Sequence, residues 1–161
     1  SSIVTPIRQV PIGRISSLDR SKVDTTLDSK FYRNPFFTTH TDSNYISQLT
    51  ALYDELLPRN NKGGPYVILD LMSSQVSHLP QDDTNGERFE RVDVHGMNHD
   101  ELEANPDRTR TNGRILVRDL NTNPSLLGCE SESNTSTIPS GCYDAVLCNV
   151  GIQYLQEPEA V

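Results

Sequence analysis

Four short apolar runs, each ending at a polar residue or a glycine, recur between residues 66 and 148 of this 161-residue chain. The runs cover residues 66–69, 92–94, 115–117 and 145–148, and only the second is interrupted by a polar residue, Asp93. Continuous apolar runs of this length are typical of strands that are buried on both faces of a sheet. The spacing leaves room for a helix or a long loop before each next strand, as in βαβ units. The sequence therefore predicts an α/β fold with parallel strands and flanking helices.

A helix is predicted ahead of the first strand. It begins at Asp42 or Ser43, either of which can cap a helix, and it ends before Pro58. Apolar side chains recur every three or four residues along it, which predicts one buried face. These side chains are Tyr45, Ile46, Leu49, Leu52, Tyr53, Leu56 and Leu57.

A short helix is predicted after the second strand. Asn98 and Glu101 form a capping box at its start, and Pro106 lies beyond its end. His95 and His99 are four residues apart, but the boundary between strand and helix falls between them. The two imidazoles therefore do not share a helical face, and no metal site is predicted.

The composition excludes several classes of protein. Hydrophobic residues make up 34% of the chain, with no Trp and 10 Pro, so only part of it can form a packed core. The net charge is −8 and residues 119–161 contain no Lys or Arg, which argues against nucleic-acid binding. No apolar run approaches the ~20 residues that a membrane span requires. We expect a soluble intracellular protein, in the cytoplasm or an organelle stroma, without nucleic-acid or membrane partners.

Both ends of the sequence look cut. It begins without Met and closes at Val161 within a helical-looking stretch. Residues 1–30 are rich in Ser and Thr and show no hydrophobic period, so we expect a disordered leader there. The predicted domain covers residues 31–161, with a polar loop insertion at 129–141. We expect it to be the N-terminal half to two-thirds of a larger domain.

The three cysteines define no framework. Their spacing contains no C-x-x-C pair, so neither a zinc site nor a disulfide scaffold is predicted. Cys129 and Cys142 can pair across the polar loop in an oxidising compartment, which leaves Cys148 over. Asn134 begins a glycosylation sequon, which we interpret as incidental because the sequence shows no signal peptide.

The strand ends predict where a ligand binds. In an open α/β sheet, ligands occupy the crevice beyond the carboxyl ends of the strands. Those ends carry carboxylates, amides and apolar side chains, namely Asp70, Met97, Asn98, Asp119, Leu120 and Asn149. Such a set suits a ligand with polar groups around a flat ring, as in a nucleoside joined to an amino acid.

Four segments carry a family resemblance. They are DLMSSQVSHLP (70–80), GMNHDELEANP (96–106), DLNTNPSL (119–126) and YDAVLCNVGIQYL (143–155). In this order they resemble a subgroup of class I S-adenosylmethionine-dependent methyltransferases, the methyltransferase type 11-like proteins, and residues 31–58 resemble the lead-in of that subgroup. The resemblance implies a seven-stranded Rossmann-like methyltransferase fold and S-adenosyl-L-methionine as the cofactor. The methyl acceptor, a small molecule or a protein, and the catalytic residues stay unassigned.

The resemblance also implies ten cofactor-binding residues. The first cofactor loop would contain Asp70, Met72, Ser73 and Ser74. Gly96, Met97 and Asn98 would lie beside the ribose and adenine, Asp119 and Leu120 near the adenine, and Asn149 beneath the methionine moiety. Two residues depart from the family pattern: the first loop contains no glycine, and Gly96 stands where the family has a ribose-binding acid.

Structural roles compete with these assignments. Asp70 can cap the turn that follows it, Asn98 can cap the short helix, and Asp119 can cap its own loop. The departures also leave open a binding-only domain that has kept the fold and lost turnover. A short-chain dehydrogenase, suggested by DAVLCNVGI (144–152), is excluded because no Lys lies four residues after a Tyr.

The resemblance implies that the chain as given does not turn over. In such sheets the fourth strand is interior and pairs with a fifth. Ala145, Val146 and Leu147 would then form an unpaired apolar edge, which is a template for aggregation. We expect the isolated chain to be poorly soluble or partly molten, and to bind the cofactor weakly or not at all.

Overall fold

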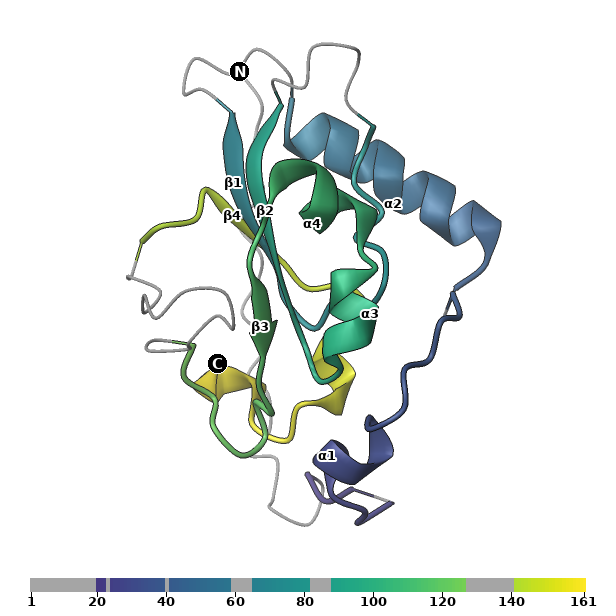
Figure 1. The fold of residues 1–161 in the computed structure, drawn as a ribbon, viewed down its shortest axis with the longest axis vertical. Coiled ribbons are helices and arrows are strands. Elements are labelled where there is room, and N and C mark those ends of the chain that lie inside the picture. The colour runs from purple at the N-terminus through teal and green to yellow at the C-terminus, as the bar shows by residue number, and fades with distance from the viewer. Residues whose placement is uncertain (1–19, 23, 40, 59–64, 82–87, 127–140) are drawn as a thin grey trace, which may run out of the picture.

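A four-stranded parallel sheet lies at the centre of the fold in a computed structural model, which describes residues 20–22, 24–39, 41–58, 65–81, 88–126 and 141–161 (Figure 1). The elements in chain order are α1 (Asp28–Phe31), α2 (Ser43–Leu56), β1 (Tyr66–Asp70), β2 (Phe89–Gly96), α3 (His99–Glu103), α4 (Pro106–Thr111), β3 (Ile115–Val117), β4 (Ala145–Leu147), and the 3-10 turns η1 (Ile152–Tyr154) and η2 (Pro158–Ala160).

The strand order across the sheet is β3-β2-β1-β4, and every pair is parallel. The predicted parallel α/β sheet with flanking helices is therefore confirmed, and all four predicted strands are present. The strand order reverses at β1, which pairs with β2 on one side and with β4 on the other. Within the described ranges no strand pairs with the outer edge of β4, and Val146 is 56% exposed there.

The two faces of the sheet are covered differently. Ile68, Val92 and Val94 face one side, where α2, α3 and α4 lie in Figure 1, and they pack with Tyr53 and Leu102 from these helices. Leu69 and Leu116 belong to a second apolar cluster, which loops rather than α-helices complete through Leu120, Tyr143 and Leu155. The alternation follows from the period of two along a strand.

Helix α2 begins where the sequence predicts. The side chain of Asp42 accepts a hydrogen bond from the backbone N–H of Tyr45 at 2.8 Å and caps the helix. The expectation of one buried face is wrong for three of the seven apolar residues: Tyr45, Leu52 and Leu56 are 41%, 47% and 62% exposed. The helix rests on the sheet through a narrow stripe near its C-terminus, around the buried Tyr53.

Pro106 lies beyond the end of α3, as the sequence predicts, and it is also the first residue of a further helix. Asn105 caps α4, and its side chain accepts hydrogen bonds from the N–H groups of Asp107 and Arg108. Proline suits the first helical position because its missing N–H needs no partner there. The short helix predicted after Asn98 is therefore followed by a second helix, α4, which the hydrophobic pattern does not predict. After Pro106, every residue of α4 is polar, so the helix has no apolar period.

Part of the expected leader belongs to the fold. Helix α1 lies within it, and the Arg20 guanidinium donates to the carbonyl of Gln156 at 2.8 Å and forms an ion pair with Glu159. Asp28 accepts a hydrogen bond from Asn121 at 3.0 Å. Residues 1–19 of the leader lie outside the described residues.

The polar insertion is almost entirely outside the described residues, which resume at 141, so the predictions for Cys129 and Asn134 concern positions beyond them. Cys142 and Cys148 are free thiols. No helix in the described ranges has the length and apolar character that crossing a membrane would require.

Candidate functional site

A cavity of about 1340 Å³ lies at the carboxyl edge of the sheet. All ten residues selected from the sequence line it: Asp70, Met72, Ser73, Ser74, Gly96, Met97, Asn98, Asp119, Leu120 and Asn149. They come from four segments that follow the four strands. The cavity lies at the carboxyl end of β1, where the strand order reverses between β2 on one side and β4 on the other. Open α/β sheets bind ligands at this position.

Asp70 is the most perturbed carboxyl group of the cavity. It ends β1 and is only 5% exposed. Burial raises the pKa of Asp70 to about 7, and the negative charge of Asp107 raises it further, although hydrogen bonds from the side chains of Ser77 and Ser73 act in the opposite direction. A carboxyl group that titrates near neutral pH in a cavity is a candidate functional group.

The loop after β1 is held by both neighbouring strands. Its backbone N–H groups donate from Leu71 to the carbonyl of Leu147 and from Ser73 to the carbonyl of His95, both at 2.7 Å. Met72 lies between them with φ +57°, in the left-handed region that favours glycine. The loop therefore keeps the backbone conformation of a glycine at a position that carries a methionine.

Two glycines, one at the end of β2 and one in the segment after β4, supply the space that this loop needs. A Cβ on Gly96 would lie 2.9 Å from the carbonyl oxygen of Ser73, and a Cβ on Gly151 would lie 2.6 Å from Cβ of Met72. Both distances are too short for real atoms. The close approach that a glycine-rich loop would provide is thus provided from β2 and from the segment after β4. An acidic side chain has no room at Gly96.

His95 connects the two loops that follow β1 and β3. Its Nδ1 accepts a hydrogen bond from the N–H of Met72 at 3.3 Å, so Nε2 carries the proton and donates to the carbonyl of Arg118 at 3.1 Å. Burial lowers the pKa of His95 to about 4, and the ring is neutral at pH 7. Both ring nitrogens are therefore engaged in hydrogen bonds inside the protein.

A second group of possible metal ligands lies on α3. One ligand atom each from His99, Asp100 and Glu103 lies within 4.8 Å of the others, and all three residues are at least partly exposed. None of them lines the cavity. Exposed acidic groups are common in this arrangement without a metal ion.

Asn98 is a structural residue at the cavity wall. Its Oδ1 accepts from the N–H groups of Asp100 and Glu101, and its Nδ2 donates to the carbonyl oxygens of Tyr32 and Arg33 at 2.9 and 3.3 Å. These four contacts use both amide protons and both lone pairs of the oxygen. The side chain caps α3 and fixes the N-terminal segment, and it has no hydrogen bond left for a ligand.

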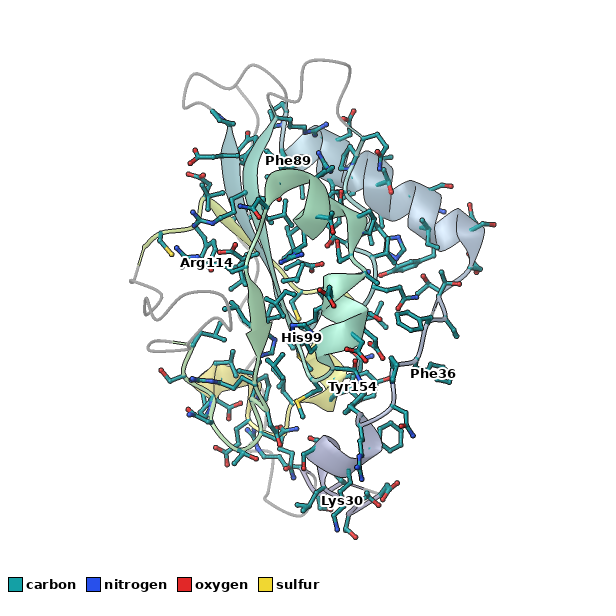
Figure 2. The ribbon with its side chains drawn as sticks, in the orientation of Figure 1. Lys30, Phe36, Phe89, His99, Arg114 and Tyr154 are labelled. Carbon is teal, nitrogen blue, oxygen red and sulfur yellow. The ribbon has the colours of Figure 1, made fainter. Side chains whose placement is uncertain are left out.

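The N-terminal segment 24–39, which we call the strap, closes one side of the cavity. Besides the two bonds from Asn98, the carboxylate of Glu101 accepts from the N–H of Phe36 and from the hydroxyl of Ser74. The large apolar side chains of the strap are exposed, and Figure 2 shows Phe36 on its outer side: Leu27 64%, Phe31 64%, Phe36 62% and Phe37 59%. The hydrogen bonds of Asn98 and Glu101 connect the strap to the start of α3.

Asp119 caps its own loop. Its Oδ1 accepts from the N–H of Asn121 at 2.9 Å and its Oδ2 from the hydroxyl of Thr122 at 2.8 Å. Asn149 accepts a hydrogen bond from the hydroxyl of Tyr45 at 2.6 Å and so connects the end of β4 to α2. Leu120 is buried beside Asp119 and supplies an apolar wall.

Negative charge dominates the cavity wall. The carboxyl groups that line it are those of Asp24, Asp28, Asp70, Glu101, Asp119 and Glu159, and the cations are Arg20, Lys22 and Arg118. Two of the cations are paired within this set, Arg20 with Glu159 and Lys22 with Asp28. Above the pKa of Asp70 the wall carries an excess of negative charge, which favours a cationic ligand.

Several residues of the site had no recognisable signal in the sequence. The strap lies mostly in segments that show no helical or strand period, and Ser77 and Asn105 lie within segments of the family resemblance without being selected as site residues. The pair Asn105-Pro106 is a good start for a helix and would have been the available signal.

Comparison with protein-family models, with curated proteins and with solved structures found no match to this chain.

Proposed function

We propose that the chain binds S-adenosylmethionine in this cavity and belongs to the class I methyltransferases with a Rossmann-like sheet. One observation carries the proposal: the ten residues selected from the resemblance, taken from four separate segments, line a single cavity. The strand order β3-β2-β1-β4 also agrees with the central part of the classic Rossmann order.

The chemistry of the cavity wall fits this ligand. S-adenosylmethionine carries a sulfonium and an ammonium group against one carboxylate, so its net charge suits the acidic wall. Leu120 and Met97 offer apolar surface for a flat base, and Asp70 offers a buried carboxylate for a cation. The volume of about 1340 Å³ exceeds the ~300–1,000 Å³ of a typical small-molecule pocket, which leaves room for an acceptor.

The proposed reaction is transfer of a methyl group to a small-molecule or protein acceptor. S-adenosylmethionine supplies the methyl group on a positively charged sulfur. The contribution of the chain is to hold donor and acceptor in line, because alignment supplies much of the rate of such a displacement. In the proposal, the loop after β1, which is hydrogen-bonded to β2 and β4, and the acidic wall hold the donor in this alignment.

Calorimetric titration of the purified chain with S-adenosylmethionine and S-adenosylhomocysteine tests the binding. The open edge of β4 is expected to make binding by the chain as given weak. We expect this weak binding to be saturable and Asp70→Ala to lower it at least tenfold further, since a buried charged partner is worth about 1.5–3 kcal/mol. The matched control is Glu103→Ala, which removes an exposed carboxylate that does not line the cavity. No binding by the parent chain, or equal affinity in Asp70→Ala, would contradict the proposal.

A binding-only domain is the second candidate. The side chains of Asn98 and Asp119 are engaged in structural contacts, and Gly96 leaves no room for an acid, so few polar groups remain for a ribose. Incubation with methyl-labelled S-adenosylmethionine and a panel of acceptors separates the candidates. Saturable binding without label transfer would favour this second candidate.

Asp119 provides a separate prediction. Because its carboxylate caps a loop, Asp119→Ala is expected to lower the free energy of unfolding by about 1 kcal/mol. Asp119→Asn keeps an oxygen for the N–H of Asn121 and should retain most of the stability. Thermal unfolding and ligand titration on both variants test this prediction. A loss of affinity in Asp119→Ala without loss of stability would instead assign the carboxylate to the ligand.

A further inference from the structure

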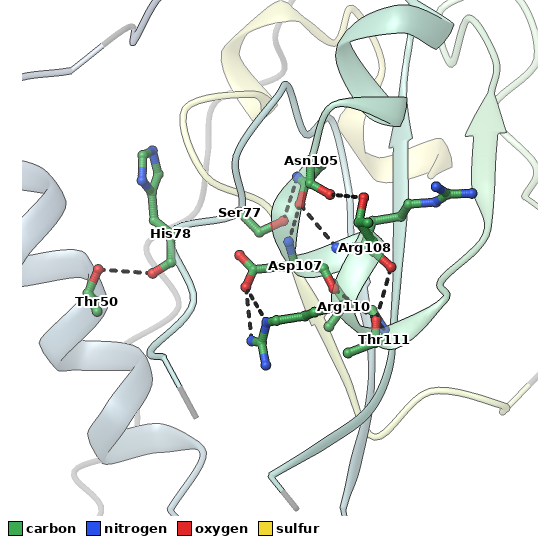
Figure 3. A network of polar contacts seen from close by, with 10 residues as sticks. Thr50, Ser77, His78, Asn105, Asp107, Arg108, Arg110 and Thr111 are labelled. Carbon is green, nitrogen blue, oxygen red and sulfur yellow. Dashed lines mark hydrogen bonds and ion pairs between the residues drawn. The ribbon is translucent and has the colours of Figure 1, made fainter. Parts of the chain in front are cut away.

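Asn105 lies beneath the loop that follows β1. Its side chain is completely buried and does not line the cavity. The amide nitrogen Nδ2 donates to Oγ of Ser77 at 2.9 Å, to the carbonyl of Ser74 at 3.2 Å and to Oγ of Ser73 at 3.3 Å. The amide oxygen faces the other way and caps α4 (Figure 3).

The direction of these bonds determines where the Ser77 hydroxyl points. A serine hydroxyl has one proton to donate. Because Oγ of Ser77 accepts from Asn105, its own proton is available to another acceptor, and Ser77 is the first of the two serines that lower the pKa of Asp70 against the effect of burial. Asn105 thereby acts on a cavity residue that it does not touch.

We propose that Asn105 is a positioning residue of the ligand site, which directs the Ser77 hydroxyl onto Asp70 and fixes the loop from Ser73 to Ser77. The importance of this role for ligand binding rests on the proposed function. The first loop contains no glycine whose conformational preference could favour its backbone conformation. The buried amide of Asn105 binds three residues of the loop and fixes that conformation through hydrogen bonds instead.

The capping role and the positioning role reside on different atoms of the same side chain. Serine is a good N-cap and keeps an oxygen for the N–H groups at the start of α4, but it lacks the amide donor. Asn105→Ser therefore retains the cap and removes the bonds to the loop. Thr109→Ala is the matched control on α4, because the Thr109 hydroxyl bonds only the backbone of Asn105 and does not reach the loop.

The charged groups around Asp70 have to be considered in the test. Asp107 on α4, Tyr53 on α2 and Cys148 after β4 interact electrostatically with it. None of these groups changes in the variants. A shift of the pKa of Asp70 in Asn105→Ser can therefore be assigned to the two loop serines that Asn105 binds, Ser73 and Ser77, and Ser77→Ala isolates the contribution of Ser77.

The experiment has two readouts on the whole chain. The first is the pH titration of the Asp70 carboxyl carbon by ¹³C NMR without ligand, and the second is calorimetric binding of S-adenosylmethionine between pH 6 and 9. We expect Asn105→Ser to raise the pKa of Asp70, because loss of a donor disfavours the charged form. Binding should weaken about fivefold or more at pH 7 and recover toward the parent value at pH 9. A role limited to folding would not produce this recovery.

Ser77→Ala removes the same hydroxyl without changing α4. It is expected to raise the pKa of Asp70 as Asn105→Ser does, and the double variant should show no further shift. An unchanged carboxyl titration in Asn105→Ser, or in Ser77→Ala where the first variant does not fold, would overturn the inference, as would an equal shift in Thr109→Ala. If the parent chain binds no S-adenosylmethionine, the proposed function fails while the carboxyl titration still decides the role of Asn105.

Discussion

Replacement of Asp70 with asparagine is expected to stabilise the folded chain at pH 8 and to weaken its binding of S-adenosylmethionine. Burial raises the pKa of Asp70 from its ordinary value of 3.8 to about 7, so ionisation opposes folding. The shift of the pKa corresponds to a loss of at most about 4 kcal/mol in the free energy of unfolding, and this loss is present in full above pH 7. Asparagine has nearly the same shape, accepts the Ser77 hydrogen bond and carries no charge.

The pH dependence of stability provides the measurement. Between pH 4 and 7 the folded chain holds a proton on Asp70 that the unfolded chain has released, so the contribution of this group to stability falls as pH rises. Denaturant unfolding across this range should show a smaller decline in Asp70→Asn than in the parent. Glu103→Gln is the control for loss of one exposed charge. Parallel curves for Asp70→Asn and the parent would show that the carboxyl group is not buried as described.

The gain in stability and the loss of binding belong together. A residue kept at a cost in stability at a cavity wall is expected where function requires it. Asp70→Asn removes the negative charge that the proposed cationic ligand would meet. The variant thus distinguishes two roles of the carboxylate. If Asp70 only capped a turn, its replacement would lower the stability of the chain instead of raising it.

Substitution of either glycine that makes room for the first loop is also expected to have a large effect. Gly96→Ala and Gly151→Ala should each lower the free energy of unfolding by about 1–3 kcal/mol, because the new methyl group overlaps the loop. We also expect each variant to lose ligand binding, since the loop has to move away from its neighbours. Denaturant unfolding and calorimetry measure the two effects.

A second substitution distinguishes the two positions. At Gly151 the overlap is with the side chain of Met72, and Met72→Gly removes that side chain and suits the φ of +57°. Met72→Gly should therefore restore stability to Gly151→Ala. It should not restore Gly96→Ala, where the overlap is with the backbone carbonyl of Ser73. Equal rescue of both variants would contradict the assigned contacts.

The sequence predicted those parts of the fold that depend on local patterns. The apolar runs of β1 to β4 and the cap at Asp42 are features of neighbouring residues, and the structure contains them. Helix α4 was missed because a helix without an apolar stripe has no hydrophobic period. Leu52 and Leu56 were predicted to be buried because periodicity identifies an apolar face but not how much of it the sheet covers.

The candidate site could be located from the sequence but not its internal contacts. Strand ends meet at one edge of a parallel sheet, so Asp70, Asp119 and Asn149 were expected to lie close together, and they line one cavity. The presence of a glycine at position 96 rather than in the first loop depends on the distance between the backbones of β2 and that loop. No pattern along one chain contains that distance, and the same holds for the amide of Asn105.

His95 makes the two loops at the ligand edge move as one unit. One ring nitrogen accepts from Met72 and the other donates to Arg118, and the ring is only 2% exposed. Displacing either loop leaves a buried ring nitrogen without a partner, which disfavours independent motion. A ligand that contacts one loop therefore finds the other already in place, and less conformational entropy is lost on binding. The strap closes another side of the same cavity and is connected to α3 by the hydrogen bonds of Asn98 and Glu101.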